Sequence, residues 1–273
     1  MRNIQPQQPN VVLLHSSASS ARQWDRLAEI LKPRFQVRAI DFHGHGEQSA
    51  WSGNTSMTLA DEAALAIPAL EEAGGAHVIG HSYGGAVALK LATMRPRLVR
   101  SVVVYEPVLF RLVLDEVARQ SPAQGILAVA GSMRKLLAAG DANSAAQIFI
   151  DFWSGARAWE SLPPGKQASI APRMHAVAQH FNALLHEPLQ LSELRRLNIP
   201  MMFVSGSRTP DVTCRIAAVL RAALPADAHE VIEAAGHMGP ITHSAEFNQR
   251  VLQFLRTQRK DSRSALQALS EAA

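Results

Sequence analysis

A serine framed by glycines is the first feature of this sequence that could do chemistry. Ser82 lies in the sequence Gly80-His81-Ser82-Tyr83-Gly84, where the β-branched run His77–Gly80 meets a segment with helical spacing. A G-x-S-x-G pattern between a strand and a helix places the serine on a sharp turn with its hydroxyl exposed. The glycines let the strand and the helix approach without a Cβ clash. The pattern predicts Ser82 as a nucleophile, with a plain strand-to-helix turn as the alternative.

A serine hydroxyl is a weak nucleophile at neutral pH and needs a histidine base within hydrogen-bond reach. Of the 11 histidines, His237 is the best candidate because it closely follows the last run that we predict to be a strand. Loops that follow parallel strands open at the carboxyl edge of the sheet, which is also the edge of the Ser82 turn. His243 is the second choice, and its position at a helix entry favours a surface role.

Two carboxylates compete to orient the histidine. Asp211 follows the predicted strand Met201–Ser205, and Glu106 directly follows the predicted strand Val99–Tyr105, so both lie at the carboxyl edge. We favour Asp211 as the acid. In the alternative role, Glu106 is a gate residue or a hydrogen-bonding partner beneath the segment that follows it.

Acyl transfer also requires hydrogen-bond donors for the oxyanion that forms in the transition state. The backbone N–H of Tyr83, the residue after the nucleophile, is one candidate donor. The loop His15-Ser16-Ser17-Ala18, which follows the first predicted strand, can supply a second.

The elements that position these residues alternate between strand-like and helical segments. The strand-like runs are nearly continuous in apolarity, which is typical of parallel strands covered on both faces. Thr58–Glu72 has capping-box spacing at its start and one apolar stripe, and it predicts a crossover helix. Ser244–Gln258 predicts a final helix. The predicted strands are Val11–His15, Gln36–Ile40, His77–Gly80, Val99–Tyr105, Met201–Ser205 and Glu230–Glu233.

The alternation fails between Pro107 and Pro188, where helical patterns occur without a strand-like run. An insertion of this length is too long for a loop and predicts a helical subdomain on one edge or end of the sheet. We therefore expect a core formed by residues 1–106 and 189–273, interrupted by a helical cap over residues 107–188. The best helical patterns within the cap are Ile126–Ala139, Ala142–Trp153 and Arg173–Leu185.

Four of these features, taken in chain order, resemble the α/β-hydrolase fold superfamily over nearly the whole chain. They are the His15 loop, the turn Asp41–Gly46, the Gly80–Gly84 elbow and the ending Gly236-His237. The resemblance implies an α/β fold with a doubly wound, mainly parallel sheet and a helical cap that shapes substrate choice.

For the site, the resemblance implies Ser82 as nucleophile, His237 as base and Asp211 as acid. It also implies that the backbone N–H groups of Ser17 and Tyr83 form the oxyanion hole. This sequence departs from the family at Ser16, where the family usually has glycine. Too few residues precede the first strand for the amino-terminal hairpin that many members have, so we expect about six strands.

Several further side chains are candidates for the substrate pocket, although core packing explains apolar residues equally well. His43 and His45 have the spacing of two metal ligands, but no further cluster completes a site, so we expect no metal and no cofactor. The pocket candidates are Ser16, His81, Glu106, Phe110, Trp153 and Met238.

Composition argues against a disordered or fibrous protein, and the distribution of charge argues against a nucleic-acid-binding one. The chain has 273 residues with 47% hydrophobic and 18% charged residues, which is typical of a globular protein. The net charge of +4 comes from 27 basic and 23 acidic residues that are interspersed. The one basic cluster, between Arg256 and Arg263, is best explained as a solvated tail, so we expect no nucleic-acid partner.

Cys214 is the only cysteine, so no intrachain disulfide can form. The N-terminus lacks the apolar segment of a signal peptide and no stretch approaches a membrane span, so we expect a cytoplasmic protein without a membrane partner. A homodimer is left open.

The sequence thus predicts a serine hydrolase that cleaves a small-molecule carboxylic ester through an acyl-enzyme on Ser82. A carbon–carbon bond hydrolase, a thioesterase or a lactonase with the same three residues is the nearest alternative. A non-catalytic receptor that binds a small ligand in the same pocket is the alternative from another class.

Overall fold

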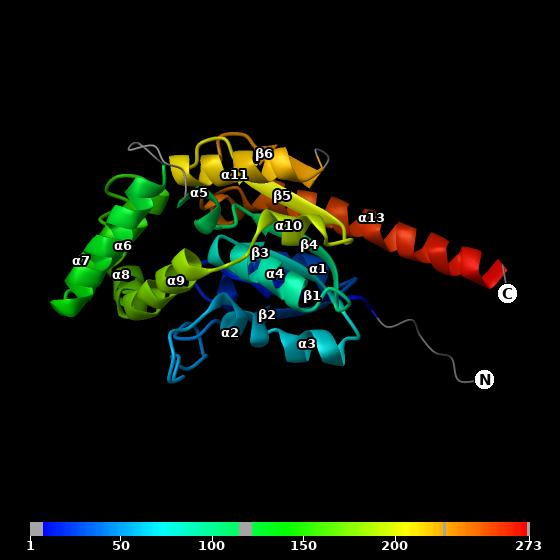
Figure 1. The fold of residues 1–273 in the computed structure, drawn as a ribbon, viewed down its shortest axis with the longest axis horizontal. Helices are drawn as coiled ribbons and strands as arrows, with labels where there is room; N and C mark the ends of the chain where they lie inside the picture. The colour runs from blue at the N-terminus through cyan, green and yellow to red at the C-terminus, as the bar shows by residue number, and fades with distance from the viewer. Residues whose placement is uncertain (1–7, 115–121, 226–227, 272–273) are drawn as a thin grey trace.

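A computed structural model describes residues 8–114, 122–225 and 228–271, with side chains up to residue 258 (Figure 1). Within these residues, six strands form one sheet in the order β2-β1-β3-β4-β5-β6. Every neighbouring pair is parallel, which confirms the predicted α/β sheet. The strands are β1 (Asn10–Leu14), β2 (Gln36–Ile40), β3 (Ala76–His81), β4 (Val99–Tyr105), β5 (Met201–Gly206) and β6 (His229–Ile232).

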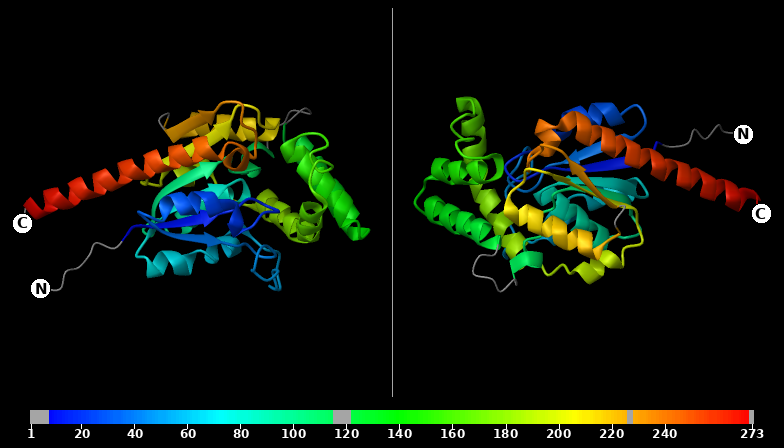
Figure 2. Two further views of the ribbon diagram at one scale, coloured as in Figure 1. Left: turned by 180° about the vertical axis from the view of Figure 1, so that it is seen from behind. Right: turned by 90° about the horizontal axis from the view of Figure 1, so that it is seen from above.

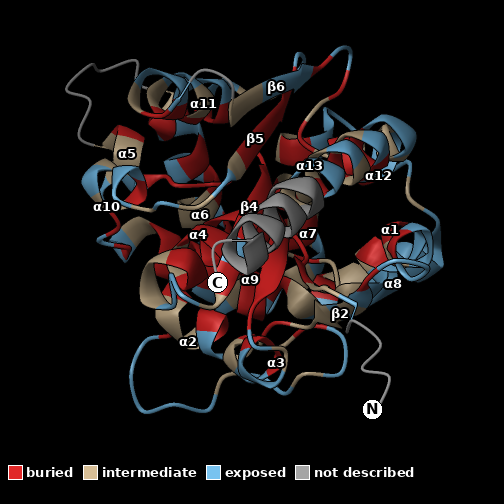
Figure 3. Ribbon diagram, turned by 90° about the vertical axis from the view of Figure 1, so that its right-hand side faces the viewer, coloured by how far each residue is buried: buried red, intermediate tan, exposed pale blue. Residues whose placement is uncertain are grey.

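Alternate residues of the central strands point into two separate cores, one on each face of the sheet. Val12 and Val78 face one core, whereas Val11 and Ile79 face the other. All four side chains are at most 1% exposed. Figure 3 shows the buried strands at the centre with partly exposed helices around them. Burial on both faces explains why the strand sequences are apolar throughout rather than alternating.

Helices cover each face of the sheet. The first core takes residues from α2 (Leu59–Ala64), α3 (Ile67–Glu72), α4 (Tyr83–Met94) and α11 (Asp211–Ala223). The second takes residues from α1 (Asp25–Leu31) and α13 (Ser244–Glu271). Short helices join these elements, namely η1 (Ala21–Trp24), α10 (Leu191–Arg195) and α12 (Gly239–Thr242).

The predicted crossover helix is divided in two. Thr58 caps α2 through the predicted capping box with Asp61, but α2 ends at Ala64 and α3 begins at Ile67. Pro68 accounts for the break because it lacks an N–H and its ring clashes with the carbonyl four residues earlier. The division leaves Glu62 on α2, with its side chain inside the protein.

The described part of residues 107–188 contains helices and no strand, and it stands at one end of the sheet (Figure 2). We call this segment the helical insertion. One contact with the core is between α9, the last helix of the insertion, and α2 of the core. Its limits as a separate domain stay a prediction. The helices are α5 (Arg111–Leu114), α6 (Ala123–Ala138), α7 (Ala142–Ser154), α8 (Pro164–Ile170), η2 (Ala171–Arg173) and α9 (Met174–His186).

The last helix is longer than the sequence pattern predicts. α13 continues to Glu271, so the segment that we predicted as a solvated tail after Gln258 is helical. The segment from 244 to 271 contains neither glycine nor proline, and its Ala, Leu, Gln, Arg and Glu residues favour a helix. Because residues 1–7 lie outside the described part, the missing amino-terminal hairpin stays a prediction.

Candidate active site

Ser82 occupies a strained turn between β3 and α4, as the G-x-S-x-G pattern predicts. Its backbone has φ 56° and ψ −113°, and its N–H donates to the Tyr105 carbonyl at 2.9 Å. A Cβ on Gly84 would overlap the carbonyl oxygen of Leu14, and one on Gly80 would overlap the carbonyl of Gly84. Both glycines are therefore required for the close approach of α4 to β1 and β3.

The Ser82 hydroxyl begins a continuous series of hydrogen bonds to a carboxylate. Ser82 Oγ lies 2.8 Å from His237 Nε2, and His237 Nδ1 lies 2.7 Å from Glu106 Oε2. All three residues are buried. We call Ser82, His237 and Glu106 the Ser82 triad, because the carboxylate can hold the imidazole with Nε2 free to accept the serine proton.

The structure corrects our choice of Asp211 for the carboxylate. Asp211 is exposed at the first position of α11, whereas Glu106 lies directly against His237. Strand order explains the difference. Glu106 follows β4, which pairs directly with β3, so it emerges beside the strand that carries Ser82.

Glu106 is fixed by further donors and by an unusual backbone conformation. The Gly206 N–H donates to its Oε1 at 2.8 Å, and the Thr209 hydroxyl donates to its Oε2 at 2.6 Å. Its φ of 42° lies in the left-handed region, as does that of Ser82. Strained non-glycine residues concentrate at functional sites, where the surrounding structure holds them in place.

Two side chains of the core hold the loop that carries His237 by hydrogen bonds to its backbone. The Tyr105 hydroxyl donates to the Gly236 carbonyl at 2.7 Å. His81 Nε2 donates to the His237 carbonyl at 2.8 Å, and His81 Nδ1 accepts from the Gln23 amide at 3.0 Å. Burial lowers the pKa of His81 well below its usual value, which agrees with this neutral form.

Trp153 of α7 reaches the triad from the helical insertion. Its ring stacks on the His237 imidazole with centroids 4.0 Å apart and an interplanar angle of 28°. An aromatic face attracts a cation, so this stacking favours the imidazolium that forms when His237 takes a proton.

The two backbone amides that we expect to form an oxyanion hole, those of Ser17 and Tyr83, lie in two segments that a hydrogen bond connects. Tyr83 is the first residue of α4, and its N–H is one of the helix-start amides that lack an intrahelical acceptor. The Gly84 N–H donates to the His15 carbonyl at 3.1 Å, which ties α4 to the loop that contains Ser17. Ser17 and Ser82 line the same pocket.

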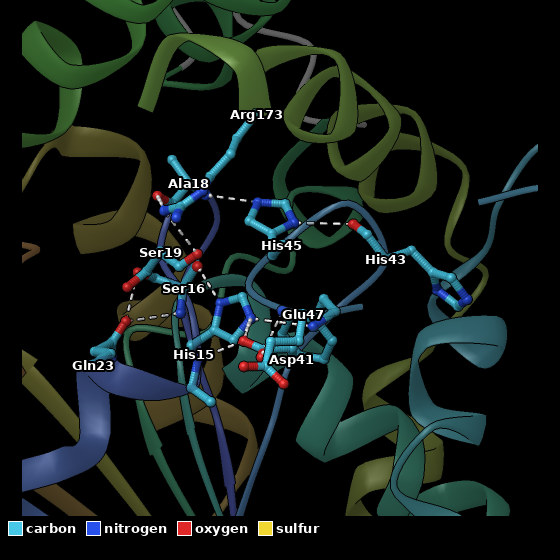
Figure 4. Close-up of polar contacts among 12 residues, drawn as sticks. His15, Ser16, Ala18, Ser19, Gln23, Asp41, His43, His45, Glu47 and Arg173 are labelled. Atoms are coloured by element: carbon cyan, nitrogen blue, oxygen red, sulfur yellow. Dashed lines mark hydrogen bonds and ion pairs between the residues drawn. The ribbon is translucent and has the colours of Figure 1, made fainter. Parts of the chain in front are cut away.

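Neutral histidines brace the Ser17 loop (Figure 4). His45 Nε2 accepts from the Ala18 N–H at 3.1 Å, and His15 Nε2 accepts from the Phe42 N–H at 3.2 Å. Burial is the main cause that lowers the pKa of both histidines to about 3. Arg173 of the insertion also fixes this loop, because its guanidinium donates to the Ala18 carbonyl at 2.9 Å.

Ser16 does not carry the strain that its replacement of glycine suggests. The left-handed residue of this loop is Ala18, with φ 61°. The N–H and the hydroxyl of Ser16 instead donate to Gln23 Oε1, at 3.0 and 2.9 Å. The side chain that replaces glycine therefore anchors the loop to the segment at Gln23.

The pocket above Ser82 is mostly apolar, and two predicted pocket residues, Phe110 and Trp153, line it. The other candidates lie elsewhere. Ser16 and His81 are buried beside the pocket in the hydrogen bonds described above, Glu106 lies beneath His237, and Met238 caps α12. The complete lining is Ser17, Ser82, Val108, Phe110, Phe149, Trp153, Val177, His180, Phe181 and Leu184.

His180 and Glu62 are polar residues of this region that the sequence analysis missed. His180 Nδ1 lies 2.8 Å from Ser17 Oγ, and His180 Nε2 lies 3.3 Å from Glu62 Oε1. The His180 ring also stacks on Tyr83 with centroids 3.7 Å apart. A polar residue on an apolar helix stripe is the sequence signal that could have identified each of them.

Across residues 8–114, 122–225 and 228–271, no helix is both long and apolar enough to span a membrane. The same ranges show no group of three His, Cys, Asp or Glu residues placed to hold a metal ion. His43 and His45 instead take part in the hydrogen bonds of the Ser17 loop and its surroundings.

Known protein families and sequences include several that are similar to this chain. Residues 11–250 match the alpha/beta hydrolase family. The chain is 25% identical over 262 residues to a pimeloyl-[acyl-carrier protein] methyl ester esterase of Aeromonas salmonicida, covering 91% of this chain and 96% of that protein. It is 36% identical over 97 residues to lipase LipV of Mycobacterium tuberculosis, and this match spans about a third of that protein (36%).

A solved structure of a hydrolase from Pseudomonas aeruginosa has a similar fold. It superimposes with a TM-score of 0.73 at 23% identity, covering 92% of this chain and 91% of that one. The family match extends over most of the sequence. This chain therefore belongs to the alpha/beta hydrolase family.

Proposed function

We propose that this protein is a serine hydrolase that cleaves a carboxylic ester with a small apolar acyl group. The observation that carries the proposal is the continuous hydrogen-bonded series from Ser82 through His237 to Glu106, at 2.8 and 2.7 Å. This arrangement supplies a nucleophile, a base and a group that orients the base.

In the proposed reaction, Ser82 Oγ attacks the ester carbonyl carbon while its proton passes to His237 Nε2. The carbonyl oxygen becomes an oxyanion and accepts from the Ser17 and Tyr83 N–H groups. The tetrahedral intermediate then collapses, and the alcohol leaves with the proton from His237. Water loses a proton to His237 and attacks the acyl-enzyme carbonyl carbon. The second tetrahedral intermediate then collapses to the free acid as its bond to Ser82 Oγ breaks, and His237 returns the proton to Ser82 Oγ.

Glu106 keeps His237 Nδ1–H directed away from Ser82 throughout. The Trp153 ring stacks on the face of the imidazole and favours the imidazolium present in both transition states. These contacts support Glu106, rather than Asp211, as the acid of the triad.

The pocket supports an apolar acyl group as the substrate class. Phe110, Phe149, Trp153, Phe181 and Leu184 surround Ser82 with aromatic and aliphatic surface. The lipase and the methyl ester esterase named above support an ester over other acyl bonds. Because this substrate is a small molecule, the function needs neither nucleic acid nor membrane, and a sole cysteine agrees with a cytoplasmic location.

The proposal is tested by labelling with a fluorophosphonate and weighing the protein. We expect one adduct on the wild type and none on Ser82→Ala, which should fold normally because it removes only one oxygen. A hydrolysis screen over p-nitrophenyl esters of increasing acyl length then defines the substrate. Thioesters, lactones and carbon–carbon substrates belong in the same screen, with Ser82→Ala as the blank.

Failure of the folded wild type to form an adduct would favour the non-catalytic receptor. Turnover of a thioester, a lactone or a carbon–carbon substrate alone would retain the triad and replace the ester. Turnover that persists in Ser82→Ala would contradict the proposed nucleophile.

A further inference from the structure

A second serine–histidine–carboxylate series reaches the pocket from the opposite side. Ser17 Oγ lies 2.8 Å from His180 Nδ1, and His180 Nε2 lies 3.3 Å from Glu62 Oε1. We call Ser17, His180 and Glu62 the Ser17 relay. His180 and Glu62 are at most 1% exposed, so the relay is open to solvent only at Ser17, in the pocket that also contains Ser82.

We propose that the Ser17 hydroxyl is a further catalytic group, a third donor to the oxyanion beside the two backbone amides. His180 and Glu62 are positioning residues that decide whether the hydroxyl proton points into the pocket. The inference rests on the proposed hydrolase function, because an oxyanion must form at Ser82 for this donor to act.

The surroundings of Glu62 determine which of its oxygens can carry a proton. Its Oε2 accepts from the His43 N–H at 3.2 Å and lies 3.0 Å from His43 Nδ1. Its Oε1 is buried, faces His180 Nε2 and has no hydrogen bond of good geometry in the described structure. We therefore assign the proton of a neutral Glu62 to Oε1, opposite His180 Nε2, which is likewise buried without a hydrogen bond of good geometry in the described residues.

The protonation states of both residues agree with this geometry. Burial raises the pKa of Glu62 to about 7, although the hydrogen bonds from His43 act in the other direction. Burial lowers the pKa of His180 to about 3, so its ring is neutral and carries a single N–H. The relay then has two proton arrangements that differ by one proton on Glu62.

With Glu62 ionised, His180 Nε2–H donates to Oε1 and Nδ1 accepts the Ser17 proton. The Ser17 hydroxyl then presents only its lone pairs to the pocket. With Glu62 protonated, Oε1–H donates to His180 Nε2, Nδ1–H donates to Ser17 Oγ, and the Ser17 proton points into the pocket. Only the second arrangement stabilises an oxyanion.

The change from the first arrangement to the second moves protons only and forms no bond between heavy atoms. Ser17 takes a proton from pocket water and passes its own to His180 Nδ1, while the Nε2 proton of His180 passes to Glu62. One proton is taken up from solvent in total. The fully buried carboxyl group can therefore exchange its proton through Ser17.

Other ionisable groups pack around the relay and influence its titration. His43 contacts Glu62 from the loop after β2, and Asp61 is its neighbour on α2. The rings of Tyr83 on α4 and His45 stack on His180, with centroids 3.7 and 4.7 Å apart. Arg173 acts on His45, whose pKa it lowers.

The Ser17 relay should give the reaction a pH dependence that requires Glu62. The active arrangement of the relay is present below about pH 7 and is lost as Glu62 ionises. In Glu62→Gln, the amide oxygen can accept from His43 while the NH₂ group donates to His180 Nε2. This variant therefore keeps the Ser17 proton directed into the pocket at every pH.

The test compares kcat/KM of the wild type and Glu62→Gln between pH 6 and pH 8.5, using the ester found by the screen. The ratio of Glu62→Gln to wild type should rise about 30-fold across this range, which is the loss of the protonated fraction of a group with a pKa of about 7. Ser17→Ala and the double variant Ser17→Ala/Glu62→Gln should show the same pH profile as each other. Glu187→Gln is the matched control, because Glu187 is also buried but pairs with Lys90.

A ratio that stays constant with pH would overturn the inference, and so would a ratio that rises equally in the Ser17→Ala background. If Glu62→Gln does not fold, Ser17→Ala alone decides: its deficit relative to wild type should shrink as pH rises, and a constant deficit would contradict the relay. Fluorophosphonate labelling of Ser82 separates the two proposals, since a labelled enzyme with a constant ratio retains the hydrolase and rejects only the relay.

Discussion

The Ser82 triad and the Ser17 relay contain the same three residue types, but their carboxylates have different surroundings. Glu106 accepts from Gly206 on one oxygen and from Thr209 and His237 on the other. Glu62 accepts on one oxygen only, and its second oxygen faces a histidine in a buried site. Donors on both oxygens fix Glu106 as a group that orients a base, whereas the bare oxygen of Glu62 can hold a proton.

The two series also differ in which parts of the fold they join. The triad uses only loops at the carboxyl edge of the sheet, after β3, β4 and β6. The relay joins the loop after β1, helix α2 of the core and helix α9 of the helical insertion. The orientation of Ser17 therefore depends directly on how the insertion packs on the core, through His180. His237 contacts the insertion through the ring of Trp153.

The largest expected effect separates the two serines. Ser82→Ala should lower kcat by about 10⁶-fold, because the nucleophile is lost. Ser17→Ala at pH 6 should lower kcat/KM by about 100-fold, as expected for one oxyanion donor. Steady-state kinetics on the same ester measures both, and similar losses in the two variants would remove the distinction between nucleophile and donor.

Acid should destabilise the protein through the histidines around the Ser17 relay. Burial lowers the pKa values of His15, His45 and His180 to about 3, so these groups stay neutral in the folded state but bind protons when the chain unfolds below about pH 6.5. The stability that they contribute is complete above pH 6.5 and is lost as pH falls. Each of these histidines should lower the equilibrium constant for folding about 100-fold at pH 4.5. Glu62, whose pKa is raised, acts in the opposite direction and offsets about one of them.

Urea unfolding at pH 7.5 and pH 4.5 measures this loss. His180→Gln should reduce the pH dependence by about one proton, and His175→Gln, an exposed position on the same helix, should not change it. An equal pH dependence in the two variants would show that His180 is not a buried neutral group.

Trp153→Ala should lower kcat/KM by about tenfold, because the stacking partner of the imidazolium is lost. Trp153→Phe should retain most of the activity, since it keeps an aromatic face over His237. If Trp153→Ala and Trp153→Phe are equally impaired, size rather than an aromatic face is the requirement.

The smallest expected effect concerns the support of Glu106. Thr209→Val removes the hydroxyl that donates to Oε2, and kcat should fall about fivefold, the size expected for one lost hydrogen bond. The Gly206 donor remains in place. A loss comparable to that of Glu106→Gln would mean that Thr209 acts directly on the reaction.

Local patterns in the sequence were sufficient for most of the fold and for two of the three triad residues. The predicted runs match all six strands. The four central strands are mostly apolar because both faces of the sheet are covered there, whereas the edge strands β2 and β6 are partly exposed. The glycines around Ser82 predict its turn because only they fit there. His237 is predictable because it follows the last strand.

The carboxylate was not predictable from spacing, since Glu106 and Asp211 each follow a strand at the same edge. Their separation depends on the strand order, which places β4 directly beside β3. The Ser17 relay was missed for a related reason. His180 and Glu62 lie on helices whose packing against each other is a tertiary contact. Pro68 in the predicted crossover helix was a local signal that we overlooked.

Comparing Glu106→Gln with Asp211→Asn tests the Ser82 triad most directly. Both variants remove one carboxylate charge with little change in shape, and kcat for the ester substrate is the measurement. We expect Glu106→Gln to lower kcat by about 10⁴-fold, because the imidazole loses its orientation. Asp211→Asn should remain within about twofold of wild type, since Asp211 is exposed at the start of α11. A large loss in Asp211→Asn together with near-normal activity in Glu106→Gln would show that Asp211, and not Glu106, orients His237.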